Sequence, residues 1–270
     1  MTLLFSDVQG FTGIAENYDA VGLTQLINDI LTPITAEVLE TGGTVDKYMG
    51  DALMAFWNAP LDDKDYARHA CLSALAIRRQ IGPLNDRLEE KARADGWAFV
   101  PVNVGVGLNT GECCVGNMGS DQRFDYSVLG DAVNLASRLE GQTRTYGVGI
   151  VTGELTKTLA DDMAFLELDL ITVKGKTIPE RIFALLGDEA LSSSAEFQEL
   201  AGLHAKMLAA YRGQRWDEAR RLIDEAAGAA SSAGLDLSRL YDLFRDRVAA
   251  FRTDPPPPDW DGVFVATTKG

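Results

Sequence analysis

The chain has 270 residues, of which 46% are hydrophobic and 24% are charged, and these proportions predict a folded protein with a sizeable core. Its formal net charge of −15 disfavours binding to nucleic acid and to anionic lipid, because phosphate backbones attract clustered lysine and arginine. No run of about 18 apolar residues is present, so no segment is expected to insert into a membrane.

The three cysteines predict no disulfide framework. Cys71 falls in an apolar helical pattern and is expected in the core, and Cys113 and Cys114 are adjacent, which disfavours a bond between them. His69 and His204 are the only histidines, so a zinc site is not expected. We therefore expect a reducing, cytoplasmic compartment. Because strand-like sequence begins almost at once, we also expect an upstream sensor or membrane anchor in a longer chain.

The first strand-like segment, LLFSDVQGFT at residues 3–12, ends in an aspartate and a turn. Residues 3–5 predict a buried strand, Asp7 falls where that strand reaches the edge of its sheet, and Gly10 allows a tight turn behind it. The alternative is that Asp7 or Thr12 only caps the helix that follows.

The other elements of the first 187 residues are predicted from hydrophobic periodicity and turn residues. They are a helix over 23–39, a hairpin over 44–58 that turns at Gly50 and Asp51, a helix over 65–94 that Pro83 bends or interrupts, a glycine-rich β segment over 100–119, a strand-to-helix passage over 124–143, and strands near 148–152, 164–174 and 179–186. This order predicts an α+β protein with a ferredoxin-like (βαββαβ) arrangement, in which helices pack on one side of a mainly antiparallel sheet.

The composition changes near residue 188. The segment SSSAEF at 192–197 is typical of a linker, and the residues from 188 to 253 predict a helical extension in which YRGQRWDEARRLIDEA resembles a single tetratricopeptide-type repeat. Residues 254–270 form a proline-rich tail whose Trp260 and Phe264 are apolar enough to dock on a neighbouring surface. We therefore expect three parts, residues 1–187, 188–253 and 254–270.

Two aspartates carry the first sign of chemistry. Asp7 ends the first strand and Asp51 lies in the turn of a hairpin that can neighbour that strand, so their carboxylates can converge at one sheet edge. Such a pair suits Mg²⁺, which is commonly held by one or two carboxylates together with substrate phosphates. The alternative is that Asp51 only serves its own turn.

Four motifs then establish a resemblance. FSDVQGFT, VDKYMGDALMAFW, GVGLNTGECCVGNMGS and YSVLGDAVNLASRLE, in this order and spacing, resemble the catalytic domain of class III nucleotidyl cyclases over about residues 2–187. The greatest likeness is to bacterial adenylate cyclases of the subgroup that has Thr or Ser at the second purine-reading position.

The resemblance implies a role for each matching residue. Asp7 and Asp51 would bind two metal ions per site, Mg²⁺ or Mn²⁺, with the carbonyl of Val8 as a further ligand. Asn134 and Arg138, one helical turn apart, would contact the ribose and the α-phosphate.

The same resemblance implies how the rest of the nucleotide is held. Lys47 and Ser127 would read the purine, and Lys47 favours adenine because its donor would oppose the N1–H donor of guanine. The amides of Gly10, Phe11 and Thr12 would meet the phosphates at a helix N-terminus. Lys174 would contact the terminal phosphates, with Lys176 as the alternative.

The resemblance implies an adenylate cyclase that forms 3′,5′-cyclic AMP and pyrophosphate from ATP in a signalling protein. It also implies a C2 homodimer with shared sites, in which Asp7, Asp51 and Lys47 of one chain face Ser127, Asn134 and Arg138 of its twin, and an arm over 113–127 crosses the interface. The alternatives are a weak or inactive cyclase-like relay module, a guanylate cyclase, and a scaffold that acts through its tail. A diguanylate cyclase is disfavoured because YMGDALMAF lacks the acidic run of that group's hairpin.

Overall fold

Strands and helices alternate along the computed structural model, which describes residues 1–96, 99–172 and 179–265. The strands are β1 (Thr2–Val8), β2 (Thr44–Met49), β3 (Ala52–Trp57), β4 (Val104–Thr110), β5 (Cys114–Ser120), β6 (Arg123–Leu129), β7 (Ile150–Gly153), β8 (Ala164–Thr172), β9 (Glu180–Gly187) and β10 (Phe264–Val265). The helices are α1 (Phe11–Ala15), α2 (Ala20–Glu40), α3 (Tyr66–Asp95), α4 (Asp131–Tyr146), α5 (Glu154–Leu159), α6 (Glu189–Ser192), α7 (Ala195–Arg212), α8 (Trp216–Ser232) and α9 (Ser238–Thr253). The α+β class is confirmed.

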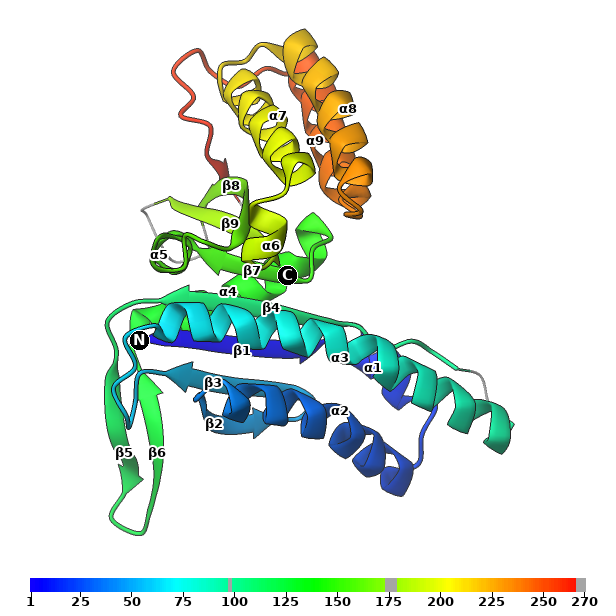
Figure 1. Cartoon of the computed structure of the whole chain (residues 1–270), viewed down its shortest axis with the longest axis vertical. Helices are drawn as coiled ribbons and strands as arrows, with labels where there is room; N and C mark the ends of the chain where they lie inside the picture. The colour runs from blue at the N-terminus through cyan, green and yellow to red at the C-terminus, as the bar shows by residue number, and fades with distance from the viewer. Residues whose placement is uncertain (97–98, 173–178, 266–270) are drawn as a thin grey trace.

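One large sheet organises the fold. Among the described residues it has eight strands in the order β10-β8-β9-β7-β4-β1-β3-β2, and β5 and β6 pair separately. β1 lies between β3 and β4 and is antiparallel to both, while the β4–β7 and β8–β10 pairs are parallel. The β5–β6 ribbon projects from the body of the molecule (Figure 1). The central position of β1 delivers Asp7 to the middle of one sheet edge.

Helices cover both faces of this sheet. Successive residues of a strand point to opposite faces, and in β1 Leu4 packs into a core cluster with residues of α2 and α3, whereas Leu3 joins a cluster that contains Ala136 of α4. α2 and α3 therefore pack on one face of the sheet and α4 packs on the opposite face. The prediction that all helices pack on one side is wrong for α4. Asp7 has the parity of Leu3, so it lies on the α4 face.

Two glycines of β4 let α4 approach the sheet closely. A Cβ atom on Gly107 would lie 2.3 Å from the carbonyl oxygen of Ala136, and one on Gly105 would lie 2.4 Å from the hydroxyl of Thr143. A side chain at Gly107 would collide with the backbone of α4, and one at Gly105 would collide with α4 side chains, which explains the glycines at these two positions.

α3 continues through Pro83 from Tyr66 to Asp95, so Pro83 does not interrupt this helix, and the alternative that Pro83 bends it stays a prediction. α1 begins at Phe11 behind Gly10, whose φ of 70° is left-handed, and no side chain caps this helix. The alternative role of Asp7 or Thr12 as a helix cap is thereby excluded.

The helical extension packs onto the sheet. Ser194 in the SSSAEF segment is the N-cap of α7 and accepts a hydrogen bond from the amide of Phe197, so a short turn joins α6 to α7 where a linker was expected. One apolar cluster contains Leu166 of β8 together with Leu200 of α7 and Phe244 of α9. In the tail, the Trp260 ring packs 5.4 Å from that of Tyr211 and 5.3 Å from that of Phe251, centre to centre. The extension and the sheet thus share a core.

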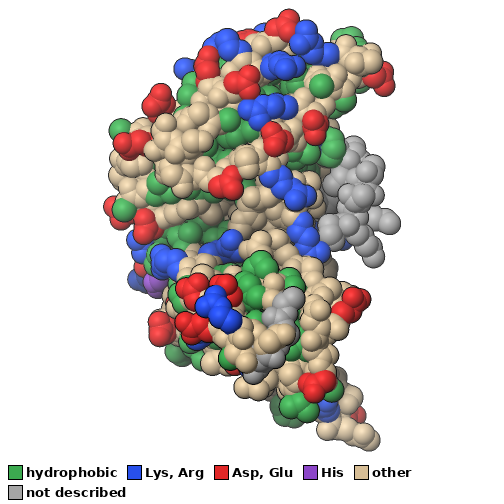
Figure 2. Space-filling view, turned by 90° about the vertical axis from the view of Figure 1, so that its right-hand side faces the viewer, with side chains coloured by type: hydrophobic (Ala, Val, Ile, Leu, Met, Phe, Trp, Pro, Cys, Tyr) green, Lys and Arg blue, Asp and Glu red, His purple; other side chains and the backbone are tan. Residues whose placement is uncertain are grey.

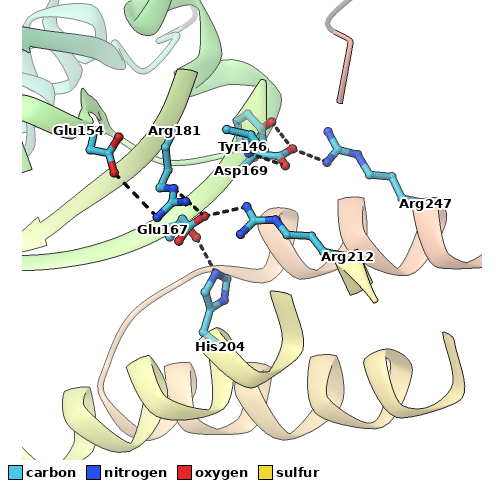
Figure 3. A network of polar contacts seen from close by, with 9 residues as sticks. Tyr146, Glu154, Glu167, Asp169, Arg181, His204, Arg212 and Arg247 are labelled. Atoms are coloured by element: carbon cyan, nitrogen blue, oxygen red, sulfur yellow. Dashed lines mark hydrogen bonds and ion pairs between the residues drawn. The ribbon is translucent and has the colours of Figure 1, made fainter. Parts of the chain in front are cut away.

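A buried polar network also joins these parts (Figure 3). Arg247 of α9 donates to the carboxylate of Asp169 in β8 at 2.5 Å, and the hydroxyl of Tyr146, the last residue of α4, donates to the same oxygen at 2.7 Å. The side chain of Asp169 is fully buried and that of Arg247 is 6% exposed. The guanidinium also lies 3.6 Å from the ring centre of Phe264 in β10. The network therefore ties the C-terminal helices to the end of α4.

Stability is expected to fall when the pH is lowered through the titration range of His204. This buried side chain donates from Nε2 to the carbonyl of Glu167, and its Nδ1 accepts from the hydroxyl of Tyr241. Burial lowers its pKa to about 4, so the folded chain binds fewer protons than the unfolded chain. The stabilisation is complete above about pH 6.5 and decreases toward pH 4, by up to about 3 kcal/mol. Urea unfolding of a His204→Gln variant across this range should show an unfolding free energy that depends less on pH than that of the wild type.

Candidate active site

Asp7 and Asp51 lie together at the sheet edge. Asp7 is near the end of β1, and the pairing of Ser6 with Leu53 brings the β2–β3 turn beside it. Asp51 accepts a hydrogen bond from the amide of Val8 at 3.2 Å. Its side chain thus reaches across to β1, so the alternative that Asp51 serves only its own turn does not describe its contacts.

The electrostatics of this pair suit a divalent cation. Burial raises the pKa of Asp51, and the negative charge of Asp7 raises it further. Within the described ranges, no group of three or more His, Cys, Asp and Glu side chains is arranged to hold a metal ion. A metal ion at this place would therefore be held by the two carboxylates together with oxygens of the substrate. This set of donors fits Mg²⁺ or Mn²⁺.

Two α4 residues beside this pair were missed by the sequence reasoning. Arg144 donates to the carboxylate of Asp7 at 2.7 Å. Burial raises the pKa of Glu140 to about 7, with Asp7 adding to the shift and Arg144 opposing it. Their i, i+4 spacing is typical of a surface ion pair, so spacing alone gives no functional signal. The usable signal was Gly105, which leaves room on β4 for the Glu140 side chain.

Asn134 and Arg138 lie nearer the N-terminus of the same helix. Asn134 is exposed, and Arg138 is half-buried with an Nη1 atom that has no hydrogen-bond partner among the described residues. Asn134 precedes Arg144 by ten residues, which corresponds to about 15 Å along an α-helix. Within one chain, Asn134 therefore lies well away from the end of α4 that contacts Asp7.

The two purine-reading candidates touch each other within one chain. The Nζ of Lys47 donates to the hydroxyl of Ser127 at 3.3 Å, and that hydroxyl donates to the carboxylate of Asp46 at 2.9 Å. The resemblance had placed Lys47 opposite the Ser127 of a second chain. Asp46 was missed because neighbouring residues of a regular strand point to opposite faces, which would direct Asp46 away from Lys47. In the structure the register of the β2–β3 pair shifts between Val45 and Lys47, so this alternation is broken at Asp46.

The phosphate-binding candidates are placed in part. Gly10 precedes α1, and Phe11 and Thr12 open it, so their amides have no acceptor within the helix. Lys174 and its alternative Lys176 lie outside the described residues.

The expected arm corresponds to the β5–β6 ribbon. Phe124 is 65% exposed and Leu129 is 63% exposed, so apolar side chains lie on the ribbon surface. Exposed large apolar side chains on a projecting ribbon are available for contacts with another chain.

Comparison with known proteins identifies the family. Residues 1–187 match the model of the adenylate and guanylate cyclase catalytic domain. The chain therefore belongs to this family, the class III nucleotidyl cyclases. No described helix has the length and apolar character needed to cross a membrane.

The curated relatives are longer proteins. An adenylate cyclase of Anabaena cylindrica is 36% identical over 182 residues, which are 65% of this chain and 34% of that protein. Adenylate cyclase 1 of Rhizobium meliloti is 30% identical over 188 residues, which are 69% of this chain and 27% of that protein. The chain thus spans about a third or less of these relatives.

Solved structures show the same fold. The adenylyl cyclase CyaB from P. aeruginosa superimposes with a TM-score of 0.62 and 36% identity, covering 69% of this chain and 93% of that one. A guanylyl cyclase superimposes with a TM-score of 0.60 and 28% identity, covering 69% of this chain and 91% of that one. The fold is therefore common to cyclases described as acting on either purine nucleotide.

Proposed function

We propose that this chain is an adenylate cyclase that converts ATP to 3′,5′-cyclic AMP and pyrophosphate. The observation that carries the proposal is the pair of carboxylates, Asp7 and Asp51, held side by side at one sheet edge in a chain of the cyclase family. In this reaction a bond forms between the ribose 3′-oxygen and the α-phosphorus, and the bond from that phosphorus to the leaving pyrophosphate breaks. Residues 1–187 would form the catalytic unit.

Asp7 and Asp51, with the carbonyl of Val8, would hold two Mg²⁺ or Mn²⁺ ions. When bound, such ions lower the pKa of a coordinated hydroxyl and neutralise phosphate charge. Arg144 neutralises Asp7 in the structure described here and would share that carboxylate with a bound cation.

The other candidates would bind and orient the nucleotide. Arg138, whose Nη1 has no partner among the described residues, would stabilise charge on the α-phosphate, and Asn134 would orient the ribose. The amides of residues 10–12 would contact the phosphates, and Lys174 would reach the terminal ones. The 3′-hydroxyl proton would pass to water or to a substrate phosphate, since the proposed site contains no histidine.

Two copies of the chain would complete each site. Because Asn134 lies about 15 Å along α4 from the residue that contacts Asp7, a single copy separates the metal-binding carboxylates from the ribose-binding amide. A C2 homodimer would place Asp7 and Asp51 of one copy opposite Asn134 and Arg138 of the other, with two equivalent sites. The exposed apolar side chains of the β5–β6 ribbon are available for such contacts.

The base-reading group would be the cluster of Asp46, Lys47 and Ser127. The side chain of Lys47 remains 46% exposed, so its ammonium can still donate to adenine N1. The buried Oδ1 of Asp46 accepts no hydrogen bond from a described residue but lies 3.5 Å from the Nζ of Lys47, so the carboxylate forms an ion pair with this lysine. Ser127 is already bonded to both neighbours, so it would act mainly by fixing their positions.

Replacing Lys47 with alanine is expected to lower kcat/KM for ATP by about ten- to a hundredfold while changing that for GTP much less, because a donor that matches adenine N1 is lost. Steady-state kinetics with both nucleotides measures this. Lys64→Ala, at an exposed lysine of the β3–α3 loop, is the matched control and should leave both values unchanged. An unchanged ATP to GTP ratio in the Lys47 variant would contradict the proposed base contact.

The decisive test of the function is product analysis. The purified chain, given Mn²⁺ and ATP, should release 3′,5′-cyclic AMP and pyrophosphate in equal amounts, which chromatography and phosphorus NMR can quantify. Absence of product from a folded dimer would favour the relay module, and faster turnover of GTP would favour a guanylate cyclase. We further propose a cytoplasmic location downstream of a sensor in a longer protein, as the output of a signalling pathway.

A further inference from the structure

A cavity rich in arginine lies beside the proposed active site. It has a volume of about 440 Å³ and is formed where β1 ends, β4 begins, and α3, α4 and α9 come together. Its lining residues include three arginines, Arg78 (α3), Arg144 (α4) and Arg239 (α9), and two residues with side-chain amides, Gln9 and Asn103. Figure 2 shows Lys and Arg side chains along the band where the helical extension meets the sheet.

Arg78 is a largely buried cation that makes no ion pair with any residue the structure describes. Its Nη1 donates to Oδ1 of Asn103 at 2.6 Å and to the carbonyl of Val104 at 2.5 Å, and both acceptors are neutral. Burial lowers its pKa, and no carboxylate opposes that shift. A buried guanidinium normally has an anionic partner, because removing its charge from water is costly.

Arg239 is the second uncompensated cation. It lies in the first turn of α9, its stem packs over Gly147, and it makes no ion pair with any described residue. Arg144 is the third guanidinium and is the one that contacts a carboxylate, that of Asp7. In the described part of the chain the cavity is therefore lined by three arginines and by no acidic residue.

Two helix ends of opposite partial charge lie at this cavity. The C-terminus of α4 faces this region, but the Thr143 carbonyl near it is satisfied by the amides of Gly147 and Val148. The N-terminal turn of α9 contributes partial positive charge from its free amides. In a chain of net charge −15, three arginines around one cavity, of which Arg144 alone pairs with a described carboxylate, are a local exception that favours an anion.

We propose that this cavity binds a phosphate group, either as inorganic phosphate or as part of a phosphomonoester. Three guanidinium groups that approach from three different helices can each pair with oxygens of a tetrahedral oxyanion. A carboxylate carries one negative charge on two oxygens in one plane, whereas a phosphate offers more charge and oxygens that point in tetrahedral directions, so phosphate suits donors that converge from different helices better. Gln9 and Asn103 bond to each other, through Nδ2 of Asn103 and Oε1 of Gln9, and border the site with neutral donors.

This site adjoins the proposed nucleotide pocket, because its lining residue Gln9 lies between Val8 and Gly10, but phosphate binding to it does not depend on the proposed function. Arg78 and Arg239 come from α3 and α9, which contribute none of the proposed catalytic residues. Arg144 belongs to both places, since it contacts Asp7 and lines the cavity. An anion that attracts Arg144 would weaken its hold on Asp7, so the site is placed to influence the carboxylate pair.

The test is calorimetric titration of the full chain in EDTA, so that metal-dependent phosphate binding does not contribute. Inorganic phosphate and glycerol phosphate are the two probes, and the tighter of the two identifies the source of the phosphate group. We expect saturable binding of at least one, weakened about tenfold by Arg239→Ala because one charged hydrogen bond is lost. Arg220→Ala, at an exposed arginine of α8 that is not among the lining residues of this cavity, is the matched control and should bind as the wild type does.

Three results would overturn the proposal. They are a lack of saturable binding of either probe, equal weakening by Arg220→Ala and Arg239→Ala, and succinate binding as tightly as phosphate. Because Arg239 is exposed, its variant should fold, and thermal unfolding of the metal-free protein verifies this. Arg78→Lys gives a second measurement, since it retains the charge while removing the planar fork, and it should also weaken phosphate binding.

Discussion

Asp51→Ala is expected to lower the kcat of cyclic AMP formation at least about a thousandfold while leaving the fold intact. That factor corresponds to about 4 kcal/mol of lost transition-state stabilisation, which is within the range for removing a metal ligand. The fold should tolerate the change because burial and the charge of Asp7 already disfavour the ionised Asp51 carboxylate. Initial rates and thermal unfolding measure both effects. Asp62→Ala, at an exposed aspartate, is the matched control and should alter neither.

The same variant tests whether sites are shared. Asp51→Ala and Asn134→Ala chains are each expected to be inactive as homodimers. In a heterodimer, one site combines both defects and the other combines the two intact halves. With equal amounts and random pairing, half of the dimers are mixed and each has one working site of two, so about a quarter of the wild-type rate should return.

Co-expression with two different affinity tags would show that mixed dimers form. If verified heterodimers remain inactive, the shared-site arrangement is wrong and a site within one chain must be considered. The contact between Lys47 and Ser127 within one chain gives this outcome a structural basis. The experiment therefore decides between two arrangements that the single chain leaves open.

The sequence predicted the elements better than their packing. The hairpin at Gly50 and Asp51 could be predicted because turn residues and strand alternation are local signals. The position of α4 on the opposite face could not, since it depends on how Gly105 and Gly107 of β4 admit the helix backbone. Local pattern does not encode such long-range contacts.

The candidate site shows the same limit. Asp7 and Asp51 could be predicted to meet because each lies at the end of a recognisable strand. Asp46 could not, because the register shift that turns it toward Ser127 leaves no trace in the alternation pattern. The contact of Arg144 with Asp7 could not be predicted for a different reason. An arginine near a helix C-terminus is common because it interacts favourably with the helix dipole, so its presence there does not indicate a carboxylate partner.

Asp169→Ala is expected to lower the free energy of unfolding by about 3–5 kcal/mol. The change leaves Arg247 as a buried cation without its carboxylate, and removing one partner of a buried ion pair costs this much. It also removes the acceptor of the Tyr146 hydroxyl at the end of α4. Urea unfolding at neutral pH measures the loss. Asp242→Ala, which removes an exposed partner of Arg245, is the matched control and should cost no more than about 1 kcal/mol.

A double variant separates the ion pair from the packing. Asp169→Leu combined with Arg247→Met should recover most of the lost stability, because apolar replacement of a whole buried pair is often neutral. If Asp169→Ala lowers the free energy of unfolding as little as Asp242→Ala does, the buried ion pair stabilises the fold no more than a surface pair. The predicted stabilising role of Asp169 is then wrong.

The same measurements show whether the helical extension and the sheet unfold together. Trp216 and Trp260 report on the extension, and the buried Trp57 reports on β3. Because β8 shares one apolar cluster with α7 and α9, the fluorescence changes of these tryptophans should coincide at a single urea midpoint. Two separated midpoints would show that the extension is an independent unit. In the coincident case, removing residues 192–270 would expose the core face of β8, so this deletion would not be a neutral test of a tail-mediated scaffold.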